Sequence, residues 1–250
     1  MDETPFRRGD TILRPVRPWT KSVHALLGSL RRHGFQAAPI PMGCDEVWET
    51  VSYLPGTTGD IDSNDAMGSE AILKSAAALL RRYHDFSALC LPDLSSVGPW
   101  QLPGREPREI VCHGDFAPYN VVLNGDEVTG IIDFEAAHPG PRSWDLAYAI
   151  YRWAPLSSQI SVEGLDKFDA QIGRARIFAD SYEMAVDARN ALPTAIIARL
   201  KALLDFMEHE AACGVEKYRL NIEQGHDRVY RLDIDYISAF SAEIAQGLSQ

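Results

Sequence analysis

The residues best suited to chemistry lie in His113-Gly-Asp-Phe-Ala-Pro-Tyr-Asn120 and, shortly after it, in Ile131-Ile-Asp-Phe-Glu135. These segments supply two carboxylates and an amide, from Asp115, Asp133 and Asn120. Mg²⁺ prefers oxygen ligands of this kind, and it commonly bridges one or two carboxylates and the phosphates of a nucleotide. In phosphoryl transfer another carboxylate orients the attacking hydroxyl and accepts its proton. We therefore expect Asp115 to be the catalytic base, and Asn120 and Asp133 to be the metal ligands.

The elements around these residues predict that their side chains converge. Val121–Leu123 and Val128–Asp133 have the composition of two strands, and Asn124–Gly125 between them is a strong signal for a tight hairpin turn. In an antiparallel hairpin, Asn120 before the first strand and Asp133 at the end of the second return to the same end. The loop that carries the predicted base leads into that end.

The same residues are also compatible with a structural role or with hydrolysis. Asp and Asn beside strands often only cap backbone groups, and we assign His113 such a role in shaping the loop. His113, Asp115 and Asp133 would also suit metal-dependent hydrolysis of a phosphate ester. The chain has one H-x-D pair and no second cluster for a two-metal site, which argues against hydrolysis. Stimulation by a nucleotide would separate transfer from hydrolysis.

The segment from His113 to Asn120 resembles the H-x-D-x₄-N catalytic loop of the protein-kinase fold. Its H-G-D form is typical of aminoglycoside phosphotransferases and choline-kinase-like enzymes. Asp133-Phe-Glu135 similarly resembles the D-F-G segment, whose Asp holds Mg²⁺. The resemblance implies an α+β, bilobal kinase-like fold, with a β-rich N-terminal lobe and a mainly helical C-terminal lobe. It also implies an enzyme that uses Mg²⁺ and ATP or GTP to phosphorylate a small-molecule hydroxyl.

The same resemblance assigns roles outside the catalytic loop. Asp145, in Trp144-Asp-Leu-Ala147, matches a residue that braces the catalytic loop from the following helix. Ser52, Tyr53 and Leu54 match the linker between the lobes, whose backbone contacts adenine. We therefore expect a small nucleotide-binding lobe over residues 1–55 and a catalytic and substrate-binding lobe over residues 56–250.

The first 55 residues predict a small sheet with one helix. A hairpin is expected over residues 6–14, and a helix follows with Thr20 as its N-cap and Gly34 as its stop. Two further strands are expected at Pro39–Gly43 and Val47–Leu54. This lobe is trimmed relative to a typical kinase.

The trimmed lobe lacks the usual phosphate-binding groups. It has neither a G-x-G-x-x-G loop nor a Walker motif. Arg14 is the best substitute for the phosphate-binding lysine, and an exposed strand arginine is the alternative. The helix position that should carry the partner glutamate is Val23, next to His24, so no ion pair is evident. A kinase-like protein that binds a ligand without turnover is therefore the alternative function.

The remainder of the chain is mostly helical, with helices expected at Ala71–Tyr83, Ile196–Ala212 and Asp227–Leu248. The segment 91–108 is rich in Pro and Gly and is either functional or disordered. The acceptor, an aminoglycoside-like antibiotic, amino alcohol, sugar or related metabolite, is expected to bind the helical lobe. Acidic and aromatic candidates for that contact are Glu135, Asp205, Glu208, Glu210, Asp233, Asp235, Tyr151 and Trp153.

The composition limits the partners. A net charge of −11 argues against nucleic acid and anionic membranes, because both repel an acidic surface. The charge would suit a cationic acceptor, although many proteins are this acidic for solubility alone. The N-terminus lacks the apolar run of a signal peptide, and no apolar stretch approaches the roughly 18 residues of a membrane span. We expect a cytoplasmic protein; the sequence does not set its oligomeric state.

Overall fold

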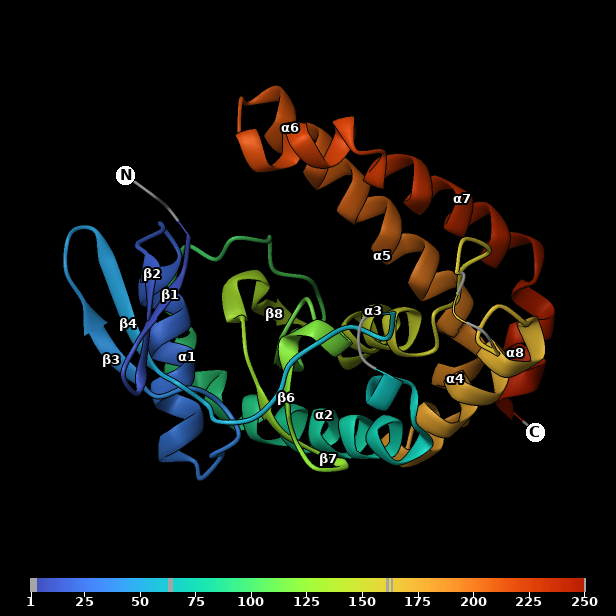
Figure 1. Cartoon of the computed structure of the whole chain (residues 1–250), viewed down its shortest axis with the longest axis horizontal. Helices are drawn as coiled ribbons and strands as arrows, with labels where there is room; N and C mark the ends of the chain where they lie inside the picture. Colours follow the sequence, from blue (N-terminus) through green and yellow to red (C-terminus); the bar gives the residue numbers. More distant parts are fainter. Residues whose placement is uncertain (1–3, 63–64, 161, 163, 250) are drawn as a thin grey trace. The chain divides into compact units, whose positions relative to one another are not determined.

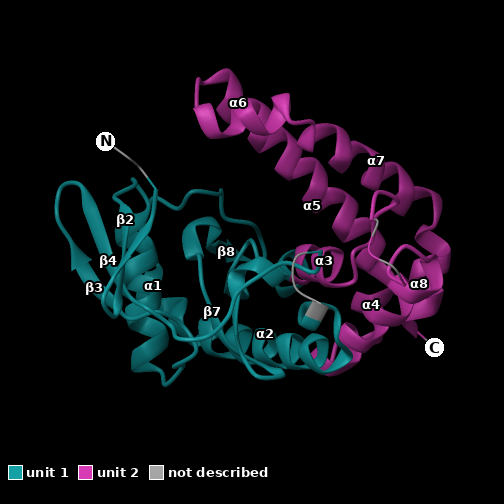
Figure 2. Ribbon diagram, viewed as in Figure 1, with its two compact units in different colours: residues 1–145 teal, residues 146–250 magenta. Residues whose placement is uncertain are grey.

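The computed structural model of the chain describes residues 4–62, 65–160, 162 and 164–249. The chain divides into two compact units, residues 1–145 and residues 146–250 (Figure 2). The first unit contains all of the strands described, and the second is helical. The α+β class is therefore confirmed. The predicted lobe boundary near residue 55 lies within the first unit and stays a prediction.

The first unit begins with a four-stranded antiparallel sheet in the order β1-β2-β4-β3 (Figure 1). Its strands are β1 (Phe6–Arg8), β2 (Thr11–Pro15), β3 (Pro41–Cys44) and β4 (Trp48–Ser52). A tight turn at Gly9, which has a φ of 62°, joins the first two strands and suits a residue without a Cβ. The predicted sheet and hairpin are confirmed, although β4 ends two residues earlier than expected.

The helix α1 (Thr20–Arg32) follows β2 and buries the predicted apolar stripe, including Val23 and Leu30. The predicted N-cap is wrong, because Trp19 occupies that position and no side chain caps the helix there. The hydroxyl of Thr20 instead accepts a hydrogen bond of 3.0 Å from the backbone N–H of Arg17. It thereby stabilises the turn before the helix.

The rest of the first unit is built around α2 (Glu70–Cys90), which contacts β5 and β7. β5 (Ile110–Cys112) pairs with β8 (His138–Gly140), and β6 (Val121–Asn124) pairs with β7 (Glu127–Ile131). The second pair is the predicted hairpin. Its second strand ends at Ile131, two residues before the predicted end.

The Pro/Gly-rich segment 91–108 lies partly along α1. The hydroxyl of Ser22 donates to the carbonyl of Pro99 at 2.6 Å, and the hydroxyl of Ser29 donates to Asp93 at 2.6 Å. Both donors are on α1. The segment is therefore bonded to α1 at these two points.

The second unit contains five helices over its described residues and most of α3 (Arg142–Trp153), which starts in the first unit. The five are α4 (Phe168–Tyr182), α5 (Val186–Ala212), α6 (Glu216–Glu223), α7 (His226–Ala239) and α8 (Ser241–Ser249). The single helix predicted at residues 227–248 is thus two helices, because the backbone leaves the helical conformation at Phe240.

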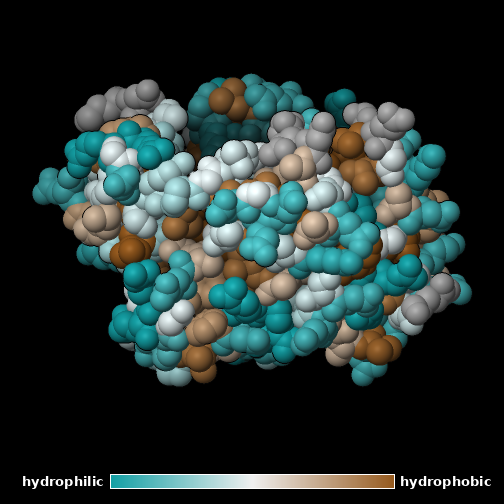
Figure 3. Space-filling view, turned by 60° about the horizontal axis from the view of Figure 1, so that its bottom comes forward, coloured by the Kyte–Doolittle hydropathy of each residue, from teal (hydrophilic) through white to brown (hydrophobic). Residues whose placement is uncertain are grey.

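No described helix is long and apolar enough to cross a membrane. On the face shown in Figure 3, hydrophobic side chains form separate patches among hydrophilic ones. Large apolar side chains that remain exposed include Phe6 and Met42 on the small sheet and Leu232 on α7. Isolated exposed apolar residues of this kind are common on protein surfaces.

Candidate active site

Asp115 lies in the loop between β5 and β6, and its carboxylate is held from both sides. The hydroxyl of Tyr119 donates to Oδ1 at 2.9 Å, and Nδ2 of Asn120 donates to Oδ2 at 2.9 Å. Nδ2 of Asn120 also donates to the backbone carbonyl of Asp115 at 2.9 Å. Each carboxylate oxygen has two lone pairs, so these bonds fix the carboxylate and still allow it to accept a substrate hydroxyl. The sequence did not single out Tyr119, although it lies within the motif.

Asn120 and Asp133 lie at the same end of the β6–β7 hairpin, as predicted. The N–H of Ile132, next to Asp133, donates to the carbonyl of Asn120 at 2.9 Å. Asp133 has left-handed backbone angles (φ 61°, ψ 70°) and a side chain that is 49% exposed. Such angles are uncommon outside glycine and often occur at functional sites. The hairpin therefore brings the two predicted metal ligands together.

The donor atoms of this pair suit a hard cation. The amide nitrogen of Asn120 donates to both the backbone carbonyl and the carboxylate of Asp115, so the amide oxygen is the atom with which it could bind a cation. The second ligand would be the exposed carboxylate of Asp133. Among the described residues, no three His, Cys, Asp or Glu side chains cluster as a metal site. Mg²⁺ at nucleotide sites commonly has few protein ligands, with phosphates and water as the others.

His113 shapes the catalytic loop, as the sequence predicted. The ring is fully buried; its Nε2 lies 2.9 Å from the carbonyl of Ile132, and the N–H of Asp115 donates to Nδ1 at 3.3 Å. These contacts fit the tautomer whose Nε2 donates to the carbonyl and whose Nδ1 accepts from the N–H. The ring also packs edge-on against Phe134, with 4.8 Å between the ring centroids. His113 thus joins the loop to the backbone just before Asp133.

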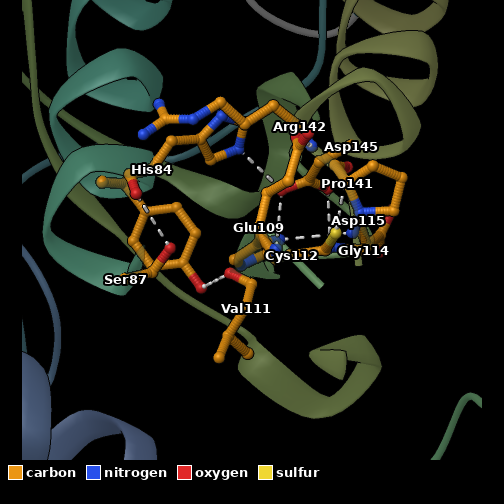
Figure 4. Close-up of polar contacts among 12 residues, drawn as sticks. His84, Ser87, Glu109, Val111, Cys112, Gly114, Asp115, Pro141, Arg142 and Asp145 are labelled. Atoms are coloured by element: carbon orange, nitrogen blue, oxygen red, sulfur yellow. Dashed lines mark hydrogen bonds and ion pairs between the residues drawn. The ribbon is translucent and has the colours of Figure 1, made fainter. Parts of the chain in front are cut away.

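Asp145 braces the catalytic loop from the start of α3 (Figure 4). Its carboxylate accepts hydrogen bonds from the backbone N–H groups of His113 at 2.7 Å and Gly114 at 2.8 Å. His84 of α2 lies 3.0 Å away through Nε2. Burial alone would raise the pKa of Asp145, but the contacts with His84 and the loop outweigh it and lower the pKa to about 2. The predicted brace is confirmed, and His84 is a partner that the sequence did not reveal.

Arg14 lies beside the metal-ligand candidate and has a partner that the sequence did not predict. Its Nη2 is 2.8 Å from Oε1 of Glu49, and its Nη1 is 3.4 Å from Oδ1 of Asp133. His24 of α1 approaches the other oxygen of Glu49 at 2.8 Å. An ion pair that was not evident from the sequence of the helix is therefore present, because the acid comes from β4 and not from α1. Glu49 lies two residues from the buried Val51 and therefore on the same face of the strand, a signal that could have identified it.

The predicted adenine contacts lie where β4 ends. The backbone N–H of Ser52 donates to the backbone carbonyl of Ile40 at 2.9 Å, and the backbone N–H of Tyr53 donates to the backbone carbonyl of Asp10 at 2.8 Å. Leu54 packs toward Gly130 of β7, where an added Cβ would lie 2.8 Å from the leucine side chain. The linker therefore runs against the catalytic hairpin, and two of its three N–H groups are bonded within the small sheet.

The predicted stacking surfaces for the acceptor are wrong. Trp153 is completely buried and Tyr151 is 4% exposed, so neither ring offers a face to a ligand. Asp233 is also buried, and it accepts hydrogen bonds from Tyr151 at 2.6 Å and Ser157 at 2.5 Å. These three residues join α7 to the end of α3 and thus have a structural role.

Comparison with known proteins agrees with this geometry. The Phosphotransferase enzyme family (APH) matches residues 93–186. The trifolitoxin immunity protein of Rhizobium leguminosarum bv. trifolii is 29% identical over 218 residues, which are 84% of this chain and 78% of that protein. Homoserine kinase of Rhodopseudomonas palustris is 34% identical over 119 residues, 48% of this chain and 33% of the kinase. This second match spans about a third of that enzyme's length.

Solved structures share the fold along most of the chain. A choline/ethanolamine kinase family protein from Mesorhizobium loti superposes with a TM-score of 0.59 at 15% identity, covering 97% of this chain and 89% of the other. The amicoumacin kinase hAmiN, in complex with AMP-PNP, Ca²⁺ and its ligand, gives a TM-score of 0.60 at 12% identity, covering 88% and 87%. The chain is thus similar to the Phosphotransferase enzyme family over residues 93–186, and it has the protein-kinase-like fold of these solved structures.

Proposed function

We propose that the chain transfers the γ-phosphoryl group of ATP to a hydroxyl of a small molecule, with Asp115 as the catalytic base. The observation that carries the proposal is the Asp115–Asn120–Asp133 arrangement. The side-chain amide of Asn120 donates to the carboxylate of Asp115, the proposed base. The backbone carbonyl of Asn120 accepts a hydrogen bond from Ile132, next to the exposed carboxylate of Asp133. The left-handed backbone and the exposed carboxylate of Asp133 support this arrangement, because such angles are uncommon outside glycine and often occur at functional sites.

The residues divide the work of the transfer between them. Asp115 would orient the acceptor hydroxyl and accept its proton as the new O–P bond forms and the bond to the leaving ADP oxygen breaks. Asn120 and Asp133 would hold Mg²⁺, which when bound supplies charge neutralisation at the phosphates. Arg14 would bind phosphate oxygens, and the backbone at Leu54 would contact the nucleotide base.

The acceptor is proposed at the level of a class. The matched relatives include a homoserine kinase and a toxin immunity protein, so amino acids, amino alcohols and antibiotics with free hydroxyls are suitable first candidates. The acidic surface would favour a cationic member of that class. The cytoplasmic location predicted from the sequence belongs to the same proposal, because ATP is supplied there.

The test begins with thermal stability in ATP or GTP, each with and without Mg²⁺. A ligand at a hundred times its dissociation constant stabilises the folded state by about 2.7 kcal/mol. We expect an Mg²⁺-dependent stabilisation by ATP that disappears in Asp133→Ala. Mass spectrometry then detects the added phosphate in a panel of hydroxyl compounds, and Asp115→Asn should keep nucleotide binding and lose transfer. Full transfer by Asp115→Asn would refute the assignment of the base.

Binding without turnover is the second candidate, and the short β1–β2 hairpin favours it. Only Gly9 and Asp10 separate these strands, so the chain has no glycine-rich loop to cover the phosphates. On this alternative, nucleotide would stabilise the protein, but no compound in the panel would gain phosphate.

A further inference from the structure

Glu49 is a buried acid at the boundary between the small sheet and α1. It is 3% exposed, and it stands directly opposite Arg14 in the antiparallel register of β2 and β4. Its Oε1 lies 2.8 Å from Nη2 of Arg14, and its Oε2 lies 2.8 Å from Nε2 of His24 without a hydrogen bond between them. A carboxylate buried to this degree needs a compensating charge, so the contact with Arg14 has an energetic cause.

The guanidinium of Arg14 is divided between two acids. Nη2 contacts Glu49 while Nη1 points to Asp133 at 3.4 Å. Because the guanidinium is planar and rigid, fixing one terminal nitrogen also sets the direction of the other. The side chain of Asp133 is 49% exposed, that of Arg14 is 12% exposed and that of Glu49 is 3% exposed. Glu49 therefore holds the guanidinium of Arg14 from the buried side, opposite Asp133.

We propose that Glu49 is a positioning residue that holds Arg14 toward the phosphates of the bound nucleotide. This inference rests on the proposed function, because it assigns Glu49 a role only if Arg14 binds phosphate. Arg14 would be the phosphate-binding group, and Glu49, the acid that holds it, lies on the neighbouring strand β4. The register of β2 and β4 fixes the distance between the two side chains. A helix that shifted relative to the sheet would therefore leave the Arg14–Glu49 pair intact.

The experiment compares the affinity of Mg·ATP with that of adenosine, which has no phosphates, by calorimetry. Glu49→Gln has nearly the same shape and should weaken Mg·ATP binding about tenfold, because the guanidinium loses its charged anchor. Adenosine binding should not change. Glu46→Gln is the matched control, because it removes the same charge from an exposed position in the preceding turn.

The effect of combining the Arg14 and Glu49 substitutions on Mg·ATP affinity distinguishes a positioning role of Glu49 from a general structural role. In an Arg14→Gln background, Glu49→Gln should cause no further loss of Mg·ATP affinity, because the group through which it acts is gone. This double variant also leaves no buried acid without its cation. An equal loss of adenosine and Mg·ATP binding, or a full further loss in the double variant, would overturn the inference.

Further outcomes distinguish a failure of the proposed role of Glu49 from a failure of the proposed function. Absence of Mg·ATP binding by the wild type would overturn both. Loss in Arg14→Gln but not in Glu49→Gln would overturn only the role of Glu49. If Glu49→Gln fails to fold, Arg14→Lys decides: a single ammonium cannot contact both acids as a fork does, so affinity should fall about as far as in Arg14→Gln. Wild-type affinity in Arg14→Lys would overturn the proposal.

Discussion

Replacement of Asp145 by Asn should destabilise the protein through the catalytic loop. The carboxylate accepts hydrogen bonds from His113 and Gly114 and contacts His84. An amide has one acceptor oxygen, so in either orientation its NH₂ group would face a backbone N–H. The fall in the pKa of Asp145 from 3.8 to about 2 alone corresponds to about 2 kcal/mol of stability at pH 7. With the buried N–H left unsatisfied, we expect the free energy of unfolding to fall by about 3 kcal/mol.

Urea unfolding of wild type and Asp145→Asn, followed by circular dichroism, measures this difference. Because the folded-state pKa is depressed, the stabilisation is present above about pH 4 and is lost as the pH falls toward 2. The two proteins should therefore converge in stability over that range. Asp85→Asn is a suitable control; Asp85 is half exposed and pairs with Arg142, so its loss should cost less than about 1 kcal/mol. A loss below about 1 kcal/mol for Asp145→Asn at pH 7, or a difference independent of pH, would refute the brace.

Three further outcomes are expected. Gly114→Ala should lower the free energy of unfolding by at least about 3 kcal/mol in a denaturant titration, because φ is +82° and the new Cβ would meet a backbone oxygen at 2.3 Å. Gly125→Ala, with φ +60° and open space, should cost only about 1 kcal/mol. Burial lowers the pKa of His84 below 6.5, so on acidification the unfolded state takes up a proton before the folded state does, and folding is destabilised. The melting temperature should therefore fall from pH 7 to pH 5 less steeply in His84→Gln than in wild type. Asp133→Asn should keep wild-type stability within about 0.5 kcal/mol, since Asn tolerates the left-handed conformation, whereas Asp133→Ala should lose about 1 kcal/mol; both should abolish Mg²⁺-dependent stabilisation by ATP.

The catalytic loop and its hairpin could be predicted because their information is local. The Asn124–Gly125 turn sets the register of β6 and β7, and the register sets which end of the hairpin carries Asn120 and Asp133. The left-handed backbone at Asp133 was not predictable in this way, because non-glycine residues rarely adopt it without support from neighbouring structure.

The helical unit shows where periodicity stops being informative. An apolar stripe continues across α7 and α8, and the stripe gives no signal for the change of direction at Phe240. The burial of Tyr151 and Trp153 was equally hidden, because both have polar atoms and could lie on a surface. Only the tertiary contact of Asp233 with Tyr151 distinguishes a packing residue from a ligand-binding one.

Glu49 shows which features follow from the local sequence and which depend on long-range contacts. Residues alternate between the faces of a strand, so Glu49 shares the buried face with Val51, and an acid on a buried face needs a partner. That much follows from the sequence of one strand. The identity of the partner depends on which residue of β2 lies opposite, and a shift of one residue would turn Arg14 to the other face of the sheet. The register of β2 and β4 therefore decides whether Glu49 can hold Arg14 in place to bind phosphate. The double-variant measurement on Arg14 and Glu49 tests this pairing through its effect on nucleotide binding.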